Sequence, residues 1–423
     1  MEWRCLAMLL LVLGLLMLGG GGWCEGCLEE ERLALSRLKL FFPFIDYTVG
    51  RPGLNYFYYD VGEDYDSVEG KESSIDCCKW GRVECNPTTG RVTKLFLDGT
   101  HMEFNFDGWH LNVSLFLPFQ ELQSLYLSGN DIAGCVAHQE LNTLKNLNEL
   151  ELGYNKIESL GSSFQDKGQL KLNKLESLYL GFNKLRGPVD VKDLNVLTNL
   201  EELILWSNGI TEVVPSQELR LMNLSFLDLI DNPLDNSKLS SLGRLSNLKI
   251  LSFGSTELKI SINITEIDGL RNLEELDVYC SSDIDCSFSL RSLDLFPSLK
   301  ALNLIGFNFN GTNSYSQNNS FRLRNLETLC IYESSLGNNF LQKIGAMPSL
   351  KILTLVDCEL NGTLHSQGFC GLTNLRELDM EGNNLKGTIP PCLMITTLNE
   401  TSQEYVRYVT TVARAPPRSL LSG

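Results

Sequence analysis

Catalytic constellations are missing from this sequence of 423 residues. Its four histidines, His101, His110, His138 and His365, are scattered, and none stands in an arrangement with an acid and a nucleophile. There is also no glycine-rich phosphate loop and no kinase-type set of lysine and aspartate. These absences argue against an enzyme, and the sequence predicts no metal site and no cofactor.

Basic residues are too few to balance the acidic ones. The chain has 35 Lys and Arg against 52 Asp and Glu, which gives a formal net charge of −17. An acidic chain is repelled by nucleic-acid phosphates and by anionic membrane surfaces, so neither is an expected partner. The charge is compatible with basic peptides or proteins, although it does not select them.

Long apolar runs are absent after the N-terminus. The run from Leu6 to Leu18 follows Arg4 and precedes small residues at Gly19 to Gly22, which is the order of a secretory signal peptide. Crossing a membrane needs ~20 apolar residues, and this run is shorter. We therefore expect residues 1–24 to be a signal peptide, and the protein to be extracellular or at the cell surface.

What the sequence does contain is a repeat, L-x-x-L-x-L-x-x-N-x-L. Side chains alternate along a strand, so the fourth and sixth positions point to one side, and stacked copies bury that side against each other. This strand phase argues against a helical array. Twelve copies, 24 to 30 residues apart, begin at Val92, Leu122, Leu147, Leu175, Leu200, Leu224, Leu248, Leu273, Leu299, Leu326, Leu350 and Leu375.

The spacing lies in or close to the range of leucine-rich repeats. The sequence therefore predicts an α/β solenoid over residues 91–398. Its expected form is a right-handed leucine-rich-repeat superhelix with a parallel β-sheet on the concave face and a disulfide-linked N-terminal cap.

The ninth repeat position is Asn in half of the copies. A buried Asn there can donate to and accept from the backbone of the bend. The six are Asn130, Asn155, Asn183, Asn208, Asn232 and Asn383, and the other copies carry Thr100, Thr256, Ser281, Phe307, Ser334 and Cys358. We therefore expect a less regular ladder from about Thr256 to Cys358.

Residues 25–90 are predicted to cover the first coil, because a solenoid otherwise exposes an apolar end. The segment from Glu29 to Phe42 mixes apolar and charged residues and favours an amphipathic helix. A cysteine-rich segment, Cys77-Cys78-Lys79-Trp80, comes shortly before the first repeat.

Secretion into an oxidising compartment favours disulfides. The adjacent Cys77 and Cys78 cannot easily bridge each other, so they must reach other cysteines. We predict the pairs Cys27–Cys77 and Cys78–Cys85. A link from Cys27 to Cys85 would overturn this pairing.

The later cysteines are less determined. A local bridge from Cys280 to Cys286 and a bridge between coils from Cys370 to Cys392 are expected. Cys358 takes an Asn position, and Cys330 is expected to be a reactive thiol if it is unpaired. The sequence shows no obvious partner for Cys24 or Cys135. Seven glycosylation sequons agree with secretion: Asn112, Asn223, Asn263, Asn310, Asn318, Asn361 and Asn399.

Together, the segment from Cys27 to Leu35, the paired cysteines with Trp80, Cys85 and the repeats resemble the ectodomain of plant leucine-rich-repeat receptor-like proteins. The resemblance covers roughly residues 25–392, and Leu385-Lys386-Gly387-Thr388-Ile389-Pro390 is similar to the outer-side motif of that family. It implies a kinase-free cell-surface receptor that detects peptides or pathogen-derived molecules and signals through a kinase-bearing co-receptor.

The family pattern continues with further repeats, a C-terminal cap and a membrane helix in the plasma membrane. Residues 399–423 contain no further copy, and we expect a disordered tail there. The sequence thus suggests a truncated member whose last coil is uncovered.

The concave face is the candidate ligand surface, because aromatic and acidic residues at strand positions suit a ligand with apolar and basic groups. The alternative is that the aromatics pack on adjacent strands and stiffen the sheet. A second, weaker patch holds Glu274, Glu275, Asp277, Tyr279, Glu327 and Tyr332. The predicted contact residues are Tyr126, Glu151, Tyr154, Tyr179, Phe182, Ile204, Trp206 and Asp228.

The function that these observations favour is extracellular recognition of a peptide or protein. The alternative is a secreted inhibitor of a cell-wall-degrading enzyme such as polygalacturonase, since such inhibitors resemble this cap and repeat type. We rank it lower because they end in a C-terminal cysteine cap that this sequence lacks.

Overall fold

The computed structural model divides the chain into two compact units. Unit 1 comprises Met1–Ile157 and Gly161–Tyr179, and unit 2 comprises Glu158–Leu160 and Leu180–Gly423. The residues that the structure describes are 27–42, 45, 76–100, 108–136, 144–160, 172–194, 197–214, 221–234, 236–255, 267, 269–280, 293, 295–309, 325–337, 340–341, 344–363, 370–386 and 406–407.

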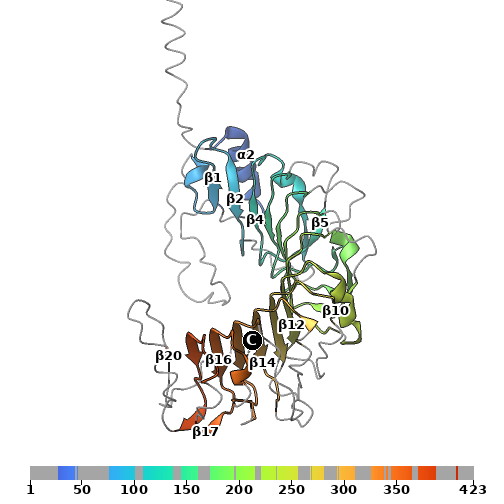
Figure 1. The fold of residues 1–423 in the computed structure, drawn as a ribbon. Helices are drawn as coiled ribbons and strands as arrows, with labels where there is room; N and C mark the ends of the chain where they lie inside the picture. Colours follow the sequence, from blue (N-terminus) through green and yellow to red (C-terminus); the bar gives the residue numbers. More distant parts are fainter. Residues whose placement is uncertain are drawn as a thin grey trace, which may run out of the picture. The chain divides into compact units, whose positions relative to one another are not determined.

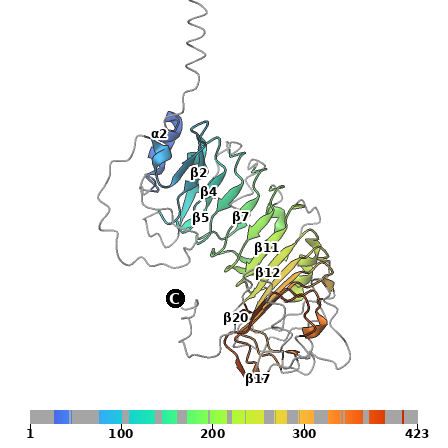
Figure 2. The ribbon, with the colours of Figure 1, turned by 60° about the vertical axis from the view of Figure 1, so that its left-hand side comes forward.

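Unit 1 begins with a helix and continues as stacked short strands (Figure 2). Strand β1 is antiparallel to β2, whereas β2, β4, β6 and β7 pair in parallel in chain order. A separate parallel pair, β3 and β5, lies outside this sheet. The elements are α2 (Glu29–Leu38), η2 (Cys77–Lys79), β1 (Val83–Cys85), β2 (Val92–Phe96), β3 (Trp109–Asn112), η3 (Val113–Phe116), β4 (Ser124–Tyr126), β5 (Ile132–Val136), β6 (Glu149–Glu151) and β7 (Ser177–Tyr179).

Unit 2 repeats the same parallel arrangement (Figure 1). Its sheet strands are β9 (Glu202–Ile204), β11 (Phe226–Ile230), β12 (Ile250–Ser255), β13 (Glu275–Cys280), β14 (Ala301–Ile305), β15 (Thr328–Tyr332), β16 (Ile352–Val356), β18 (Glu377–Asp379) and β20 (Val406–Arg407). Its described residues also form outer strand pairs and 3-10 helices, which are β8 (Arg186–Asp190) with β10 (Gly209–Val214), β17 (Asn361–Thr363) with β19 (Asn384–Lys386), η5 (Val191–Leu194), η6 (Asn236–Arg244) and η9 (Ile344–Ala346).

The core lies between the sheet and the returning segments of each coil. All twelve first-position residues are buried, and the most exposed of them, Leu375, has a relative exposure of 7%. Complete burial of one such side chain contributes roughly 1.5–3 kcal/mol. The predicted solenoid of stacked parallel strands is therefore confirmed, with its leucines turned inward.

The asparagine of the ninth position joins neighbouring coils. The Asn155 amide nitrogen donates to the carbonyl oxygens of Leu127 and Leu152, each at 3.0 Å. Its amide oxygen accepts the backbone N–H groups of Asn130 at 3.0 Å and Ile132 at 2.9 Å. One side chain thus satisfies backbone groups of two coils at the bend, where the strand ladder has ended.

Other side chains take part of this role where the asparagine is absent. The Ser334 hydroxyl donates to the Tyr332 carbonyl at 2.7 Å and accepts the Phe307 N–H at 2.9 Å. The Cys358 thiol donates to the carbonyl oxygens of Ile331 and Val356, both at 3.3 Å. Serine and cysteine thus supply a small buried donor in these two copies, whereas Phe307 fills the same position with a buried ring and no donor.

The expected irregularity between Thr256 and Cys358 is wrong. Strands β12 and β13 have six residues each, and β14, β15 and β16 have five, with no shift in register from β11 to β16. Strands β6 and β7 of the asparagine-containing copies have three. The ladder consists of backbone hydrogen bonds, so a change of side chain after the strand does not interrupt it.

The eighth position turns the chain out of the strand with a positive φ. Left-handed backbone is unfavourable for residues that have a Cβ, so glycine suits the position. Four copies carry glycine there, and six carry larger residues. The ten are Gly99, Gly129, Tyr154, Phe182, Ser207, Asp231, Gly306, Glu333, Asp357 and Gly382.

The cap is tied to the first coil by sulfur and by a buried carboxylate. The structure has the pairs Cys27–Cys77 and Cys78–Cys85, with Cα atoms 5.6 and 5.5 Å apart, as the sequence analysis proposed. The fully buried Glu31 accepts the Val92 N–H at 2.8 Å, and burial raises the pKa of Glu31.

The cap helix ends earlier than the sequence pattern predicted. Helix α2 stops at Leu38 and buries Leu35 and Leu38, whereas Leu40 is 83% exposed. Beyond the helix, the Phe41 ring stacks on Trp109 at 5.9 Å between centroids. The Trp109 indole N–H donates to the Asn130 carbonyl at 2.7 Å, so the end of the cap reaches the asparagine bend.

The C-terminal segment also departs from expectation. Residues 399–423 were expected to be a disordered tail with no further repeat, and two of them form β20, which pairs in parallel with β18 through Val406 opposite Leu378 and Arg407 opposite Asp379. An edge strand presents unpaired backbone groups, and a following segment can satisfy them. In the described ranges, no helix is long and apolar enough to cross a membrane.

The asparagine bend can be tested by removing one of its buried members. We expect Asn155→Ala to lower the free energy of unfolding by about 3 kcal/mol or more, because buried backbone N–H and C=O groups lose their partners. Asn183→Ala should lower it less, since Asn183 is half-buried and water can reach the groups it leaves. Urea unfolding of both variants measures the difference, and equal losses would contradict this account.

The positive φ of the eighth position predicts a stabilising substitution. Glu333 is exposed and has a φ of 47°, so Glu333→Gly should raise the free energy of unfolding by about 1 kcal/mol. Glu333→Ala keeps the Cβ and should bring no gain. The urea midpoints of the two variants decide, and a gain shared by both would point to the side chain instead of the backbone.

Candidate functional site

Each unit presents its own strand face, the side of the sheet that carries repeat positions 3, 5 and 7. Of the predicted contact residues, unit 1 holds Tyr126, Glu151, Tyr154 and Tyr179, and unit 2 holds Phe182, Ile204, Trp206 and Asp228. The two faces have different chemistry.

A row of aligned side chains crosses the face of unit 1. In the ladder Phe96 lies opposite Tyr126, Tyr126 opposite Glu151, and Glu151 opposite Tyr179. The Phe96 and Tyr126 rings stack at 4.8 Å between centroids, and the Tyr126 hydroxyl donates to Glu149 at 2.6 Å. The aromatic part of this row therefore packs on itself, which is the alternative that the sequence left open.

The carboxylates of unit 1 are poorly solvated. Burial raises the pKa of Glu151 to about 7, with further repulsion from Asp98 and Glu149. Burial also raises the pKa of Asp98 to about 6, although the Ser128 N–H donates to it at 2.9 Å. A cation placed between these groups would relieve the repulsion. The sequence analysis missed Asp98, although its seventh-position phase in the first copy places it on this face.

The two remaining tyrosines of unit 1 hold different places. Tyr179 is half-buried at the end of β7, in the row just described. Tyr154 is half-buried at the left-handed turn, with a φ of 51°, so its backbone direction is set by the bend.

Unit 2 holds an aromatic pair whose geometry is fixed by its neighbours. The Phe182 ring meets Trp206 edge to face at 4.5 Å between centroids and is 43% exposed. The Trp206 indole lies over Gly181, where an added Cβ would overlap the ring. Because Gly181 has no side chain, the indole can pack directly against its backbone. We call Phe182 and Trp206 the aromatic pair.

An acidic cluster formed by Asp228, Asp231 and Asp277 lies on the strands that follow the aromatic pair, and the hydroxyl of Ser207, the residue after Trp206, donates to Asp231 at 3.4 Å. Burial raises the pKa of Asp228 to about 6, and the charges of Asp277 and Asp231 add to the shift. The ladder aligns Asp228 with Ser252 and Ser252 with Asp277. The Ser252 hydroxyl donates to Asp277 at 2.7 Å, and this hydrogen bond holds the Asp277 side chain in place.

Neighbouring polar groups extend the acidic cluster without neutralising it. The Asn303 amide donates to Asp277 at 2.5 Å and to Glu275 at 3.3 Å. Burial, followed by the three aspartates, raises the pKa of Tyr279. Within the described residues, no group of three or more His, Cys, Asp or Glu side chains is placed to hold a metal ion.

Ile204 contributes little to the exposed surface. It lies opposite Asp228 in the ladder and keeps 8% of its exposure, because it packs between neighbouring strands. The second predicted patch is divided. Glu275, Asp277, Tyr279 and Tyr332 are at strand-face positions, whereas Glu274 and Glu327 line a different hollow.

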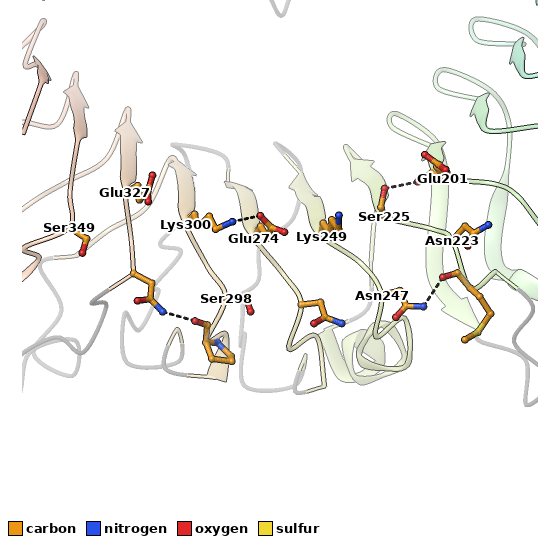
Figure 3. A pocket seen from close by; sticks show the side chains of 14 residues that line it. Glu201, Asn223, Ser225, Asn247, Lys249, Glu274, Ser298, Lys300, Glu327 and Ser349 are labelled. Carbon is orange, nitrogen blue, oxygen red and sulfur yellow. Dashed lines mark hydrogen bonds and ion pairs between the residues drawn. The ribbon is translucent and has the colours of Figure 1, made fainter.

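That hollow, which we call the edge groove, lies at the beginning of the strands of unit 2 (Figure 3). It has a volume of about 820 Å³ and extends from Glu201 to Ser349. The sequence analysis missed it, although charged residues recur at the second repeat position in several copies. These charged second-position residues were counted with the rest of the strand face, so they did not indicate a separate groove.

The two described free thiols are less reactive than the sequence suggested. Burial raises the pKa of Cys330, despite hydrogen bonds with Thr354 and Tyr332. Burial also raises the pKa of Cys358 to about 12. Less thiolate is therefore present at neutral pH than in an exposed cysteine. Cys280 and Cys370 are disulfide-bonded, and their predicted partners, Cys286 and Cys392, lie outside the described residues.

Three predicted glycosylation sites can be placed. Asn112, Asn223 and Asn361 are all exposed, which an acceptor asparagine requires. Asn223 also lines the edge groove. Asn263, Asn310, Asn318 and Asn399 lie outside the described residues.

Comparisons with known proteins agree with this architecture. The family profile Leucine Rich Repeat matches residues 374–394. The chain is 34% identical to Cuscuta receptor 1 of Solanum lycopersicum over 409 residues, which is 87% of this chain and 34% of that protein. It is 32% identical to Receptor like protein 21 of Arabidopsis thaliana, over 56% of this chain and 23% of that protein.

The chain thus spans between about a quarter and a third of the length of these relatives. Among solved structures, an internalin of Listeria monocytogenes is 18% identical, with a TM-score of 0.45, over 73% of this chain and 88% of that one.

The raised carboxyl pKa values predict a pH dependence of stability. Folding raises the pKa of Glu151 to about 7 and those of Asp98 and Asp228 to about 6, so the folded state holds protons that the unfolded state releases. Their contribution is therefore fully present below the unfolded pKa values and is lost as the pH rises through about 6 to 7. We expect a higher melting temperature near pH 5 than near pH 8.

Calorimetry of Glu151→Gln tests whether Glu151 causes the pH dependence of the melting temperature. This variant cannot ionise at the position, so its melting temperature should fall less between the two pH values. Glu158→Gln, at an exposed site, should behave as the parent does. An unchanged pH dependence in Glu151→Gln would exclude the assignment.

Proposed function

We propose that the chain, which belongs to the leucine-rich-repeat receptor-like proteins of plants, recognises an extracellular peptide or protein on the strand faces of its repeats. The ligand would carry an apolar side chain close to one or more basic side chains. The observation that carries this proposal is the aromatic pair beside the acidic cluster within unit 2.

The aromatic pair is suited to contact with a ligand because its rings are held in place by neighbouring residues and are still partly exposed. Trp206 is half-buried on Gly181, and Phe182 is 43% exposed beside it. Tryptophan is enriched among the residues that dominate binding energies, and an indole already held in one position loses little entropy on binding. An apolar ligand side chain would cover the exposed edges of both rings.

The acidic cluster is the part of the site that would bind the basic side chain of the ligand. Burial is the main cause of the raised pKa of Asp228, and the charges of Asp277 and Asp231 add to it. A lysine or arginine side chain would restore the ionised form and add charge-assisted hydrogen bonds. The net charge of −17 would also attract a basic ligand during encounter.

The partners follow from the family. The relatives are receptor-like proteins, which supports a place outside the cell or at its surface. We further propose that signalling, where the protein is anchored, runs through a kinase-bearing co-receptor. Within unit 2, the acidic cluster would serve the ligand, and the rest of the surface would remain for such a partner.

A peptide-display selection against the purified secreted chain tests the ligand class. We expect enriched peptides to combine an aromatic or aliphatic residue with lysine or arginine. Trp206→Ala and Asp228→Asn should each weaken an enriched peptide by about tenfold or more, which corresponds to ~1.4 kcal/mol. Gly181→Ala should also weaken it, because the added methyl group displaces the Trp206 indole although no contacting residue is itself replaced.

Matched controls separate contact from general damage. Leu40→Ala removes an exposed apolar side chain of the cap, and Glu381→Gln removes an exposed carboxylate, so neither should change affinity. Equal affinity of Trp206→Ala and the parent would reject the aromatic pair as the contact. Tight binding to polygalacturonase that needs neither Trp206 nor Asp228 would favour the inhibitor role instead.

A further inference from the structure

The edge groove is separate from the aromatic pair and the acidic cluster. Its lining comes from three repeat positions, which are the second position and the two residues before the first position. It lies wholly in unit 2. Its volume of about 820 Å³ falls in the range of ligand sites, but its lining is polar.

The floor of the groove is a row of amides. Asn247 donates to the Met222 carbonyl at 2.6 Å, Asn272 to Ser246 at 2.9 Å, and Asn325 to Pro297 at 2.9 Å. Each amide nitrogen is thus anchored on the preceding coil. The Oδ1 atoms of these three exposed side chains accept no hydrogen bond from any described residue, so the groove offers a row of oriented acceptors.

The wall of the groove carries charges that alternate from strand to strand. Lys300 pairs with Glu274 at 2.6 Å, and the next two copies repeat this arrangement with Lys351 and Glu327 at 2.6 Å. Such pairs alone would only brace the sheet. Lys249 differs, because it forms no ion pair with a described residue and faces the middle of the groove (Figure 3).

The lysines recur on every second coil. Lys249, Lys300 and Lys351 immediately precede β12, β14 and β16, and the ladder from β12 to β16 has no shift in register. Lys249 and Lys300 line the groove, and Lys351 lies outside the lining but pairs with the lining residue Glu327. Two strand spacings amount to roughly 9.4–9.8 Å. Each lysine ammonium has three N–H donors, so a lysine that already donates to one glutamate can donate to a second carboxylate.

One regular chain conformation matches this spacing. A polyproline II helix has three residues per turn and rises about 3.1 Å per residue, so every third side chain faces the same way at intervals of about 9.3 Å. Its backbone has no internal hydrogen bonds, so the N–H of each residue that is not proline, such as each acidic residue, is free to donate to an amide oxygen of the floor. On an extended β-strand, side chains on one face repeat every 6.6–6.8 Å or so, which does not fit.

We propose that the edge groove binds a segment of a partner protein in the polyproline II conformation, with an acidic side chain at every third position facing Lys249, Lys300 and Lys351. The site would be independent of the ligand surface proposed for the strand face. The acidic choice rests on Lys249, since Glu274 and Glu327 are already paired. Glu201 forms no ion pair with any residue that the structure describes, but it stands at one end of the groove and outside the alternate spacing.

Fluorescence anisotropy with synthetic peptides tests the proposal on the purified chain. The first probe is a peptide of five Glu-Pro-Pro triplets, and the second has the same residues with the glutamates grouped at one end. We expect the periodic peptide to bind about tenfold more tightly or better. A peptide of Lys-Pro-Pro triplets should not bind, and one of Glu-Gly-Gly triplets should bind more weakly because it is not preformed.

Charge reversal locates the site. Lys249→Glu breaks no described ion pair and should weaken the periodic acidic peptide by about tenfold or more. Lys386→Glu, at an exposed position of β19 outside the groove, has the same charge change and should leave affinity intact. Equal losses in both variants would show general electrostatics only, and equal binding of periodic and grouped peptides would overturn the match of spacing.

Discussion

The hydrogen bonds of the ninth repeat position are the constraint on which the rest of the structure depends. A coil of a solenoid must leave its strand, and at that point the backbone groups lose their ladder partners. Asn155 restores five such bonds across two coils. Leucine burial supplies the driving force for stacking, but it is non-directional. In the copies that have asparagine, the amide bonds fix the bend that follows the strand, whereas the backbone ladder itself holds the register of successive strands.

The left-handed residue before the ninth position is the second part of the same bend. It aims the ninth side chain inward, so the asparagine and the positive φ belong together. Large residues occur there at a conformational penalty, as at Tyr154 and Phe182. Phe182 is turned toward Trp206 by this backbone conformation. A requirement of the fold therefore also positions an aromatic side chain on the candidate site.

Buried like charges are the feature of the strand faces that the fold does not need. Asp98 and Glu151 in unit 1, and Asp228 with its neighbours in unit 2, are held where ionisation is opposed. Apolar residues at the same positions would satisfy the sheet equally well. Groups of this kind tend to gather where a protein binds something. The edge groove shows the opposite solution, since most of its charges are paired across neighbouring strands.

The sequence by itself determined the parallel solenoid, the buried leucines, the asparagine bend and the pairs of cap cysteines. These features follow from a short period or from local geometry, which a linear pattern records. Only the tertiary structure decided that Trp206 rests on Gly181, that Asp98 approaches Glu151, and that Lys249 faces a groove. Each of these contacts joins residues of different coils, separated by one or two repeats of variable length. Their meeting depends on how the coils stack and on which side chains leave room for others, and no single repeat contains that information.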